Sequence, residues 1–398
     1  MASAGSNVPS PADIFTWTVE AGLRETEIEP LIAGFVDRLA ATVPSVARIL
    51  VGIPTLHPTI VSGSWIWQRG GRLEGTRHSI HSQADEDWLS SPIYYAMQRG
   101  VQRIRADLTD PEQVSRFPVF RTFAASGHTD YLLRMVMFED ETRVSGIEGM
   151  IVTFLSDAPV GFSPTDLATI EKVLPALGLA MFRLAASEVA RNLLAAYLGP
   201  EAGRRVLGGR IRRGDVERIK AAVFFADLRK YTDISQRMPP DEMVAWLNAG
   251  LAALGDPTAR HGGEILKFLG DGLLAIFPTE AGEADACRRA LAAAEEGLKA
   301  LATLNGSARG GVYEADVALH VGEVAYGNVG ASDRLDFTVI GPTVNEVSRM
   351  EALCDALNVN VIMSETFASQ AGVPTRDLGL HRLRGLAEPR RLVTLTNS

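Results

Sequence analysis

Two aspartates in the second half of the chain stand where they could share a metal ion. Asp227 ends a continuous apolar run, residues 221–226, which is typical of a strand covered on both faces. Asp271 lies in an Asp-Gly turn between the apolar segments 264–269 and 273–277, which predict a β-hairpin. If that hairpin neighbours the first strand, the two carboxylates converge. Carboxylates without Cys or His beside them suit Mg²⁺ or Mn²⁺, and two such ions can clamp a phosphate. The spacing alone also fits two ordinary turn aspartates.

The elements that must position these aspartates follow a βαββαβ order from about Ile219 onward. We expect an α+β domain of the ferredoxin-like kind, with its helices on one face of the sheet. The predicted segments after the first strand are a helix at 241–260, the hairpin, a helix at 284–304, strands near 317–321 and 336–340, and a helix at 342–357.

The helix predicted at 342–357 has a polar and an apolar face. Asn345 and Arg349 are four residues apart and therefore share one face. Val347, Met350 and Cys354 point away from that face, toward the predicted core.

Bulk composition excludes several classes of protein. The chain has 398 residues, enough for two domains, and its net charge of −9 argues against a nucleic-acid partner. Only two cysteines occur, so we expect no disulfide framework and a reducing, cytoplasmic location. The N-terminus lacks the pattern of a signal peptide. The longest apolar run, 173–182, is about half of what a membrane span needs, so we expect no membrane segment.

The first half predicts a separate domain of helices and strands. We place domain boundaries at 1–27 for an N-terminal helical segment, 28–166 for the first domain, 167–218 for a helix and linker, and 219–398 for the second domain. Helices are expected at 12–23 and 28–43, and strands at 45–55, 60–69, 131–139 and 147–155. Residues 198–214, rich in Gly and Arg, predict a linker that separates the two halves and continues a helical connection between them.

A helix beginning near Ser163 carries apolar residues at alternating steps of four and three. This spacing fits a heptad seam between two parallel helices of a dimer. The alternative is the last helix of a domain packing on its own sheet, an arrangement that Pro175 favours for the first turns, and of the two we favour the dimer helix. The seam consists of Ile170, Leu174, Leu177, Met181 and Leu184.

Four segments together resemble the class III nucleotide cyclase domain, over roughly residues 219–395. They stand in the order and spacing of that family, which makes the resemblance very specific. The segments are FFADLRKYTDIS (224–235), EILKFLGDGLLAIF (264–277), LHVGEVAYGNVG (319–330) and FTVIGPTVNEVSRME (337–351).

This resemblance implies a metal site and a purine site. Asp227 and Asp271 match the aspartates that bind two divalent ions, Mg²⁺ or Mn²⁺, with the carbonyl of Leu228 assisting. Lys267 matches the lysine that donates to an adenine ring nitrogen. Thr338, where many adenylyl cyclases carry aspartate, resembles the class IIIb subgroup, whose threonine hydroxyl takes part in adenine recognition.

The resemblance also implies catalytic residues and a dimer. Asn345 matches the residue that orients the ribose, and Arg349 the one that neutralises charge on the α-phosphate. Arg384 falls where the family often has a basic residue for the terminal phosphates. In this family the metal aspartates come from one protomer and the other residues from its partner. One chain that holds both sets therefore implies a homodimer with two equivalent sites, which converts ATP to cyclic AMP and pyrophosphate.

Alternatives remain open at this point. Lys267 disfavours a guanylyl cyclase, because guanine presents donors where adenine accepts. The turn LGDGL differs from the GGDEF turn of diguanylate cyclases. A catalytically silent domain that only binds ATP or dimerises would usually have lost a key residue. Two positions depart from the family pattern: Lys230 stands where glycine is common, and Pro342 where a polar residue is common.

The first domain resembles a GAF-type sensor, with a PAS-like fold as the alternative. Aromatic residues gather in it and could line a pocket for a small-molecule ligand, although such a set more often forms core. His78 and His81 form an H-x-x-H pair, which is usually solvated and only rarely binds a metal. The aromatic residues are Trp65, Trp67, Trp88, Tyr94 and Tyr95.

Overall fold

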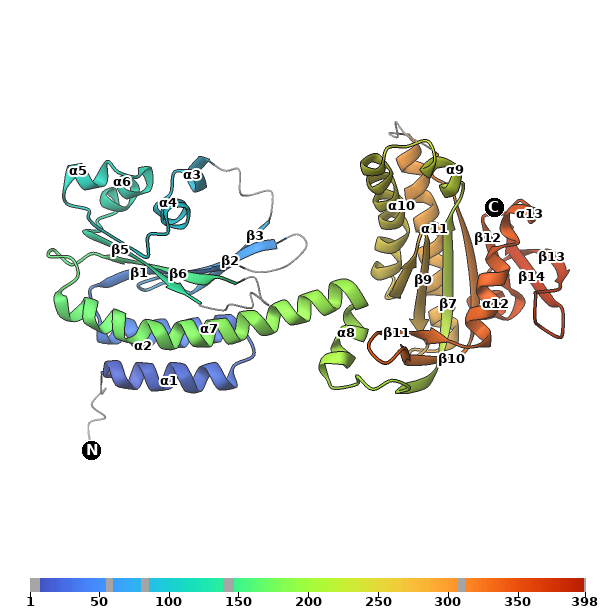
Figure 1. The fold of residues 1–398 in the computed structure, drawn as a ribbon, viewed down its shortest axis with the longest axis horizontal. Helices are drawn as coiled ribbons and strands as arrows, with labels where there is room; N and C mark the ends of the chain where they lie inside the picture. The colour runs from blue at the N-terminus through green and yellow to red at the C-terminus, as the bar shows by residue number, and fades with distance from the viewer. Residues whose placement is uncertain (1–7, 55–59, 80–85, 139–146, 307–311, 397–398) are drawn as a thin grey trace. The chain divides into compact units, whose positions relative to one another are not determined.

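The computed structural model describes residues 8–54, 60–79, 86–138, 147–306 and 312–396. The chain divides into two compact units, residues 1–193 and 194–398 (Figure 1). Both units combine helices with largely antiparallel sheets, so the predicted α+β class is confirmed.

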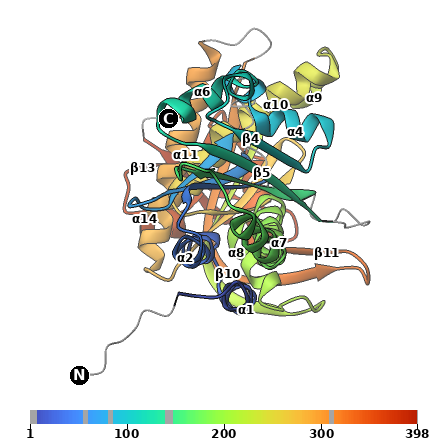
Figure 2. The same cartoon turned by 90° about the vertical axis from the view of Figure 1, so that its left-hand side faces the viewer.

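The N-terminal unit is built on a six-stranded antiparallel sheet in the order β3-β2-β1-β6-β5-β4. Helices α1 (Pro11–Arg24), α2 (Ile28–Thr42) and α7 (Pro164–Leu198) cover one face, as Figure 2 shows, and shorter helices cover the other. These shorter helices are α3 (Glu86–Leu89), α4 (Pro92–Arg99), α5 (Pro111–Val114) and α6 (Pro118–Ala125). The strands are β1 (Val46–Pro54), β2 (Ile60–Gln68), β3 (Glu74–Ser79), β4 (Arg103–Asp107), β5 (Asp130–Met137) and β6 (Gly149–Ser156).

Helix α7 corrects the dimer-seam interpretation. All five seam residues are at most 2% exposed and pack in the core between α7, the sheet and the first two helices. Side chains that are buried within their own unit cannot face a second copy of the helix. The apolar spacing of α7 therefore reflects packing on its own sheet.

Among the described residues, α7 is the one helix whose length and apolar composition would allow it to cross a membrane, yet about half of its most apolar stretch is buried in the protein, as in a core helix.

The C-terminal unit is built on an eight-stranded sheet in the order β13-β14-β12-β10-β7-β9-β8, with β11 paired to β10. When the short helices α8 and α9 are left aside, its first six elements give the predicted βαββαβ order. The strands are β7 (Val216–Leu228), β8 (Glu264–Leu269), β9 (Gly272–Pro278), β10 (Ala315–Gly330), β11 (Leu335–Ile340), β12 (Val361–Ser364), β13 (Thr375–His381) and β14 (Arg390–Leu395). The helices are α8 (Pro200–Leu207), α9 (Tyr231–Ser235), α10 (Pro240–Arg260), α11 (Glu283–Asn305), α12 (Pro342–Glu351), α13 (Cys354–Leu357) and α14 (Glu365–Ala371).

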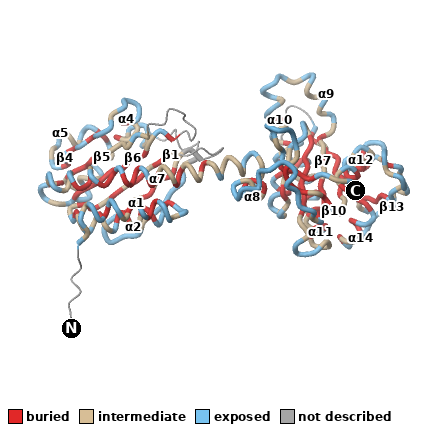
Figure 3. Tube along the Cα trace, turned by 60° about the horizontal axis from the view of Figure 1, so that its bottom comes forward, coloured by how far each residue is buried: buried red, intermediate tan, exposed pale blue. Residues whose placement is uncertain are grey.

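Strand β7 lies inside this sheet between β10 and β9, and from Ala221 onward it is buried on both faces (Figure 3). Ala222, Phe224 and Ala226 face the core formed with α10 and α11. Ala221 and Val223 point the other way, toward Val347, Met350 and Cys354 of α12 and α13. Helices therefore cover both faces of the sheet, and the expectation of helices on one face is wrong. The apolar side of α12 requires a sheet surface of its own.

The segment at 198–214 contains a short helix. Residues 200–207 form α8, whose Ala202 is fully buried in the core on the α12 face of the sheet. Pro200 occupies the first helical position, where its missing N–H costs nothing. Part of the predicted linker therefore packs on the C-terminal unit's own sheet.

Candidate active site

The two predicted metal aspartates lie side by side at one end of the sheet. Asp227 is the penultimate residue of β7 and stands opposite Gly272, the first residue of β9. The backbone N–H of Leu228 donates to the carbonyl of Asp271 at 3.3 Å. Pairing between β7 and β9 thus brings the hairpin turn next to the end of the central strand. The side chain of Leu228 is buried in the core, so a contact of this residue with an ion could be made only by its backbone.

Negative charge accumulates around these aspartates. Burial, the charge of Asp271 and the charge of Asp316 together raise the pKa of Asp227 to about 6. Burial likewise raises the pKa of Asp271. Asp316 is the direct cross-strand partner of Asp227 on β10, which explains its influence. A divalent cation between the carboxylates would relieve this repulsion.

The predicted metal ligands fit a cation whose remaining coordination positions are filled by groups from outside the protein. Within the described parts of the chain, no cluster of three or more His, Cys, Asp or Glu side chains is arranged to hold a metal. Two carboxylates and one carbonyl leave open positions, as Mg²⁺ sites commonly do when they bind substrate phosphates and water. The residues therefore fit ions that are held jointly by the protein and a nucleotide.

Three further charged residues surround the aspartates and were not singled out from the sequence. Arg229 forms an ion pair with Asp316, with Nε 2.7 Å from Oδ1, and donates from Nη2 to the carbonyl of Val359 at 2.9 Å. Glu351 ends α12, and burial together with the charges of Asp227, Asp316 and Asp271 raises its pKa to about 7. Arg229 follows Asp227 by two residues, whereas Asp316 and Glu351 reach the site through the cross-strand register and the placement of α12.

The predicted purine-reading residues meet at a different place. Lys267 of β8 donates from Nζ to Oδ2 of Asp336 on β11 at 2.8 Å. Thr338 lies two residues beyond Asp336, so both occupy the same face of β11. The Thr338 hydroxyl is buried and has no hydrogen-bond partner. A buried hydroxyl without a partner is costly, and a ligand that accepts or donates there would offset that cost.

Asn345 and Arg349 lie on α12 as predicted, on the side that faces away from the core. Asn345 is exposed, and Arg349 is partly buried beside the loop between β13 and β14. A Cβ atom added to Gly385 in that loop would lie 3.4 Å from Nη1 of Arg349. The neighbouring Arg384 is exposed. The two arginines therefore come from elements that lie close together.

The metal aspartates and the purine-reading residues lie at opposite ends of β10. Asp316, the partner of Asp227, is the second residue of that strand, whereas Gly327, the partner of Thr338, lies near its other end. One protomer thus presents the metal aspartates and Thr338 at different locations.

The local backbone bears on both departures from the family pattern: it shows why glycine is common at position 230 and why proline is tolerated at position 342. Lys230 has a backbone φ of 61°, in the left-handed region that favours glycine, and its ammonium lies 3.7 Å from Glu314. Pro342 is the first residue of α12, where proline suits the helix start.

The aromatic residues singled out in the N-terminal unit do not gather around one pocket within the described residues. Trp65 and Trp67 pack in the core beneath α1, α2 and α7, and the indole N–H of Trp65 donates to Glu29 at 2.9 Å. Tyr95 is exposed and contacts Phe117, which belongs to the core on the opposite face of the sheet. Trp88 and Tyr94 contact each other edge to face. His78 shares a hydrogen bond with Ser64, and His81 lies outside the described residues.

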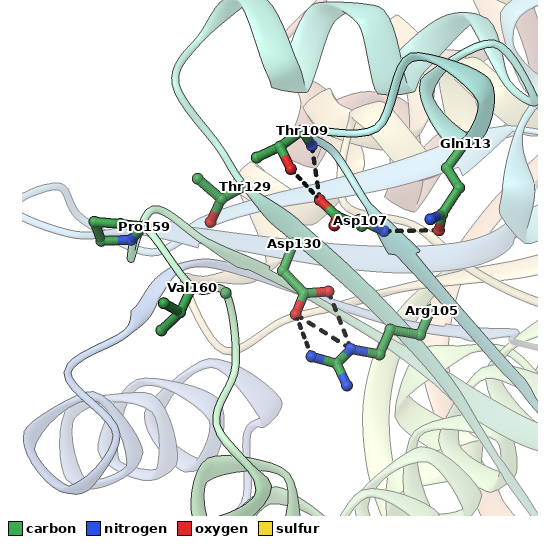
Figure 4. A pocket seen from close by; sticks show the side chains of 9 residues that line it. Arg105, Asp107, Thr109, Gln113, Thr129, Asp130, Pro159 and Val160 are labelled. Atoms are coloured by element: carbon green, nitrogen blue, oxygen red, sulfur yellow. Dashed lines mark hydrogen bonds and ion pairs between the residues drawn. The ribbon is translucent and has the colours of Figure 1, made fainter.

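The N-terminal unit has a polar pocket elsewhere, with a volume of about 360 Å³ (Figure 4). Its centre is the ion pair between Arg105 and Asp130, in which Nη2 lies 2.7 Å from Oδ2. Asp130 also accepts from the backbone N–H of Phe162. Asp107 accepts from both the backbone and the hydroxyl of Thr109. These polar groups are paired with one another.

Comparisons with known proteins agree with the geometry of the C-terminal unit. Residues 216–385 match the adenylate and guanylate cyclase catalytic domain. Adenylate cyclase 2 of Rhizobium meliloti (strain 1021) is 30% identical over 233 residues, which are 57% of this chain and 63% of that protein. The adenylate cyclase of Anabaena cylindrica is 30% identical over 159 residues, which are 39% of this chain and 31% of that protein. The C-terminal unit therefore carries a class III nucleotide cyclase catalytic domain.

The chain spans less than two thirds of the length of either relative. Among solved structures, the adenylyl cyclase CyaB from P. aeruginosa is 25% identical, with a TM-score of 0.43 over 46% of this chain and 97% of that one.

Proposed function

We propose that this protein is an adenylyl cyclase that converts ATP to 3′,5′-cyclic AMP and pyrophosphate. The observation that carries the proposal is the adjacency of Asp227 and Asp271 at the end of β7, in a domain that also holds Lys267, Asn345 and Arg349. Relatives described as adenylate cyclases, at 30% identity, support ATP as the substrate. Lysine at position 267 supports it further, because an ammonium group can only donate and adenine presents ring acceptors.

The proposed reaction is an in-line displacement at the α-phosphorus. The ribose 3′-oxygen loses its proton and forms a bond to that phosphorus, while the bond to the bridging oxygen breaks and pyrophosphate leaves. Two divalent ions, when bound at Asp227, Asp271 and the carbonyl of Leu228, would supply positive charge to the phosphates. Arg349 neutralises charge on the α-phosphate, and Asn345 orients the ribose. Arg384 binds the terminal phosphates. Catalysis then rests on positioning and electrostatics.

Two copies of the chain are needed in this account. The metal aspartates of one protomer act on a nucleotide whose base and ribose are held by Lys267, Thr338, Asn345 and Arg349 of the other. The separation of the metal aspartates from Thr338, at opposite ends of β10 within one protomer, supports this arrangement. A homodimer would then contain two equivalent sites, and a monomer would be inactive.

The N-terminal unit is proposed to be a GAF-like sensor that regulates the cyclase. Its six-stranded antiparallel sheet between helical layers supports this assignment, with a PAS-like domain as the alternative. Helix α7 leads directly from this unit toward α8 and the catalytic domain. A small-molecule signal would act through that connection.

The test is product analysis with the full-length protein. ATP and GTP are each supplied with Mg²⁺ or Mn²⁺, and nucleotides are separated by chromatography. Cyclic AMP from the wild type, with at least a hundredfold loss in Asp227→Ala and in Asn345→Ala, would support the proposal. Cyclic GMP as the main product would replace it with a guanylyl cyclase. ATP binding without any cyclic product would favour a silent ATP-binding module.

A further inference from the structure

A buried glutamate at the start of β8 joins three elements of the C-terminal unit. Glu264 is 8% exposed, and its Oε1 accepts hydrogen bonds from the hydroxyl of Tyr326 on β10 and from the backbone N–H of Ala202 on α8, the latter at 3.2 Å. A buried carboxylate is costly unless donors surround it, so these two contacts must persist for β8 to keep its position.

Helix α8 is fixed to this junction in two further ways. The side chain of Ala202 is fully buried in the same core cluster as Tyr326. The guanidinium of Arg205 lies 4.8 Å from the centre of the Tyr326 ring and pairs with Glu201 and with Glu217, the cross-strand partner of Tyr326. α8 therefore packs directly over the link between β8 and β10.

Strand β8 depends on this link because it is an edge strand. Among the described strands it pairs with β9 alone, and its register with β9 shifts between Ile265 and Lys267. The edge of β8 that faces away from β9 is held by contacts of its side chains. Glu264 ties its beginning to β10 and α8, and Lys267, three residues on, pairs with Asp336 of β11. Leu266 packs between them, in the same cluster as Tyr326 and Phe337.

We propose that Glu264 and Tyr326 are positioning residues that hold Lys267 beside Thr338 for purine recognition, with α8 as the third member of the link. The inference rests on the proposed role of Lys267 in binding adenine. Neither residue touches the nucleotide. Their effect passes along β8, so movement of α8 would change the discrimination between ATP and GTP.

The experiment measures nucleotide binding, which does not depend on turnover. ATP and GTP compete with a fluorescent ATP analogue for the full-length protein, and Mn²⁺ binding is followed by electron paramagnetic resonance. Tyr326→Phe removes one hydrogen bond to a charged group and keeps the ring. We expect its preference for ATP over GTP to fall about tenfold, the usual weight of such a bond, with Mn²⁺ affinity unchanged.

Two variants complete the design. Glu264→Gln keeps an acceptor of the same shape and should retain the wild-type preference. Tyr313→Phe makes the same chemical change at another buried tyrosine, in the core on the opposite face of the sheet, and should also retain it.

The outcomes separate this inference from the proposed function. If the wild type binds ATP more tightly than GTP but makes no cyclic product, the proposed activity is wrong. The role of Glu264 and Tyr326 is then still decided by the binding preferences of the variants. If Tyr326→Phe and the wild type show the same preference for ATP over GTP, the positioning role is wrong, even if the variant is less stable to heat. A loss of equal size in Tyr313→Phe, or no ATP preference in the wild type, would overturn it as well.

Discussion

Replacing Asp227 by asparagine should stabilise the fold while it removes the proposed metal site. The substitution keeps the shape of the side chain and removes a charge that burial, Asp271 and Asp316 all disfavour. Carboxylates gathered for a cation destabilise the protein when the cation is absent, a common conflict between stability and function.

The size of the effect follows from the raised pKa. A rise from 3.8 to about 6 corresponds to about 3 kcal/mol at neutral pH. Because Asp227 is only half-buried, solvent screening reduces this to about 1.5 kcal/mol. The folded-state pKa of this acid lies above its unfolded value, so the penalty is absent below about pH 4 and grows as pH rises. It is complete above the folded pKa, and the gain in Asp227→Asn should follow the same course.

Amide hydrogen exchange of β7 and β9, measured without divalent ions, reports the stability of this unit alone. We expect slower exchange in Asp227→Asn than in wild type at pH 7.5, and no difference in the free energy of opening near pH 4. Added Mn²⁺ should stabilise the wild type only. Asp233→Asn, at an exposed position on α9, is the charge-matched control. An Asp227→Asn protein that is less stable than wild type at pH 7.5 would refute the reasoning.

Three further substitutions test other parts of the account. Lys267→Glu places a carboxylate against Asp336 and should lower kcat/KM for ATP at least a hundredfold; a steady-state assay that shows an unchanged value would contradict the adenine role. Leu177→Ala, in the core beneath α7, should cost about 2–5 kcal/mol in urea unfolding without changing the sedimentation behaviour, whereas dissociation of a dimer would reinstate the heptad seam. Lys230→Gly should raise the free energy of unfolding by about 0.5 kcal/mol, because the strain relieved at a left-handed residue slightly exceeds the entropy that glycine adds to the unfolded chain. The exposed ion pair of Lys230 with Glu314 contributes little. A loss of stability above about 1 kcal/mol would disprove this.

The order of elements around the site could be predicted because each has a strong local pattern. The run at 221–226 and the hairpin at 264–277 are marked by continuous apolar residues and an Asp-Gly turn. Their pairing in space brings Asp227 next to Gly272. The helical spacing of Asn345 and Arg349 likewise depends only on neighbours along the chain.

Contacts that depend on long-range register could not be predicted. Asp316 faces Asp227 only because β10 pairs with β7 over thirteen residue pairs, and Glu351 approaches the site only through the placement of α12. Residues 200–207 have the composition of a linker, yet burial of Ala202 stabilises a helix there. The apolar spacing of α7 carries no information on whether its partner is another chain or its own sheet.

The central claim is that each active site is shared between two copies of the chain. Asp227→Ala and Asn345→Ala proteins, each inactive alone, are mixed in equal amounts and assayed for cyclic AMP. Random exchange of protomers makes half of the dimers mixed, and each mixed dimer has one intact site. The account predicts recovery to about a quarter of the wild-type rate. No recovery in a mixture whose exchange of protomers is shown independently would contradict it, because both sets of residues would then act within one protomer.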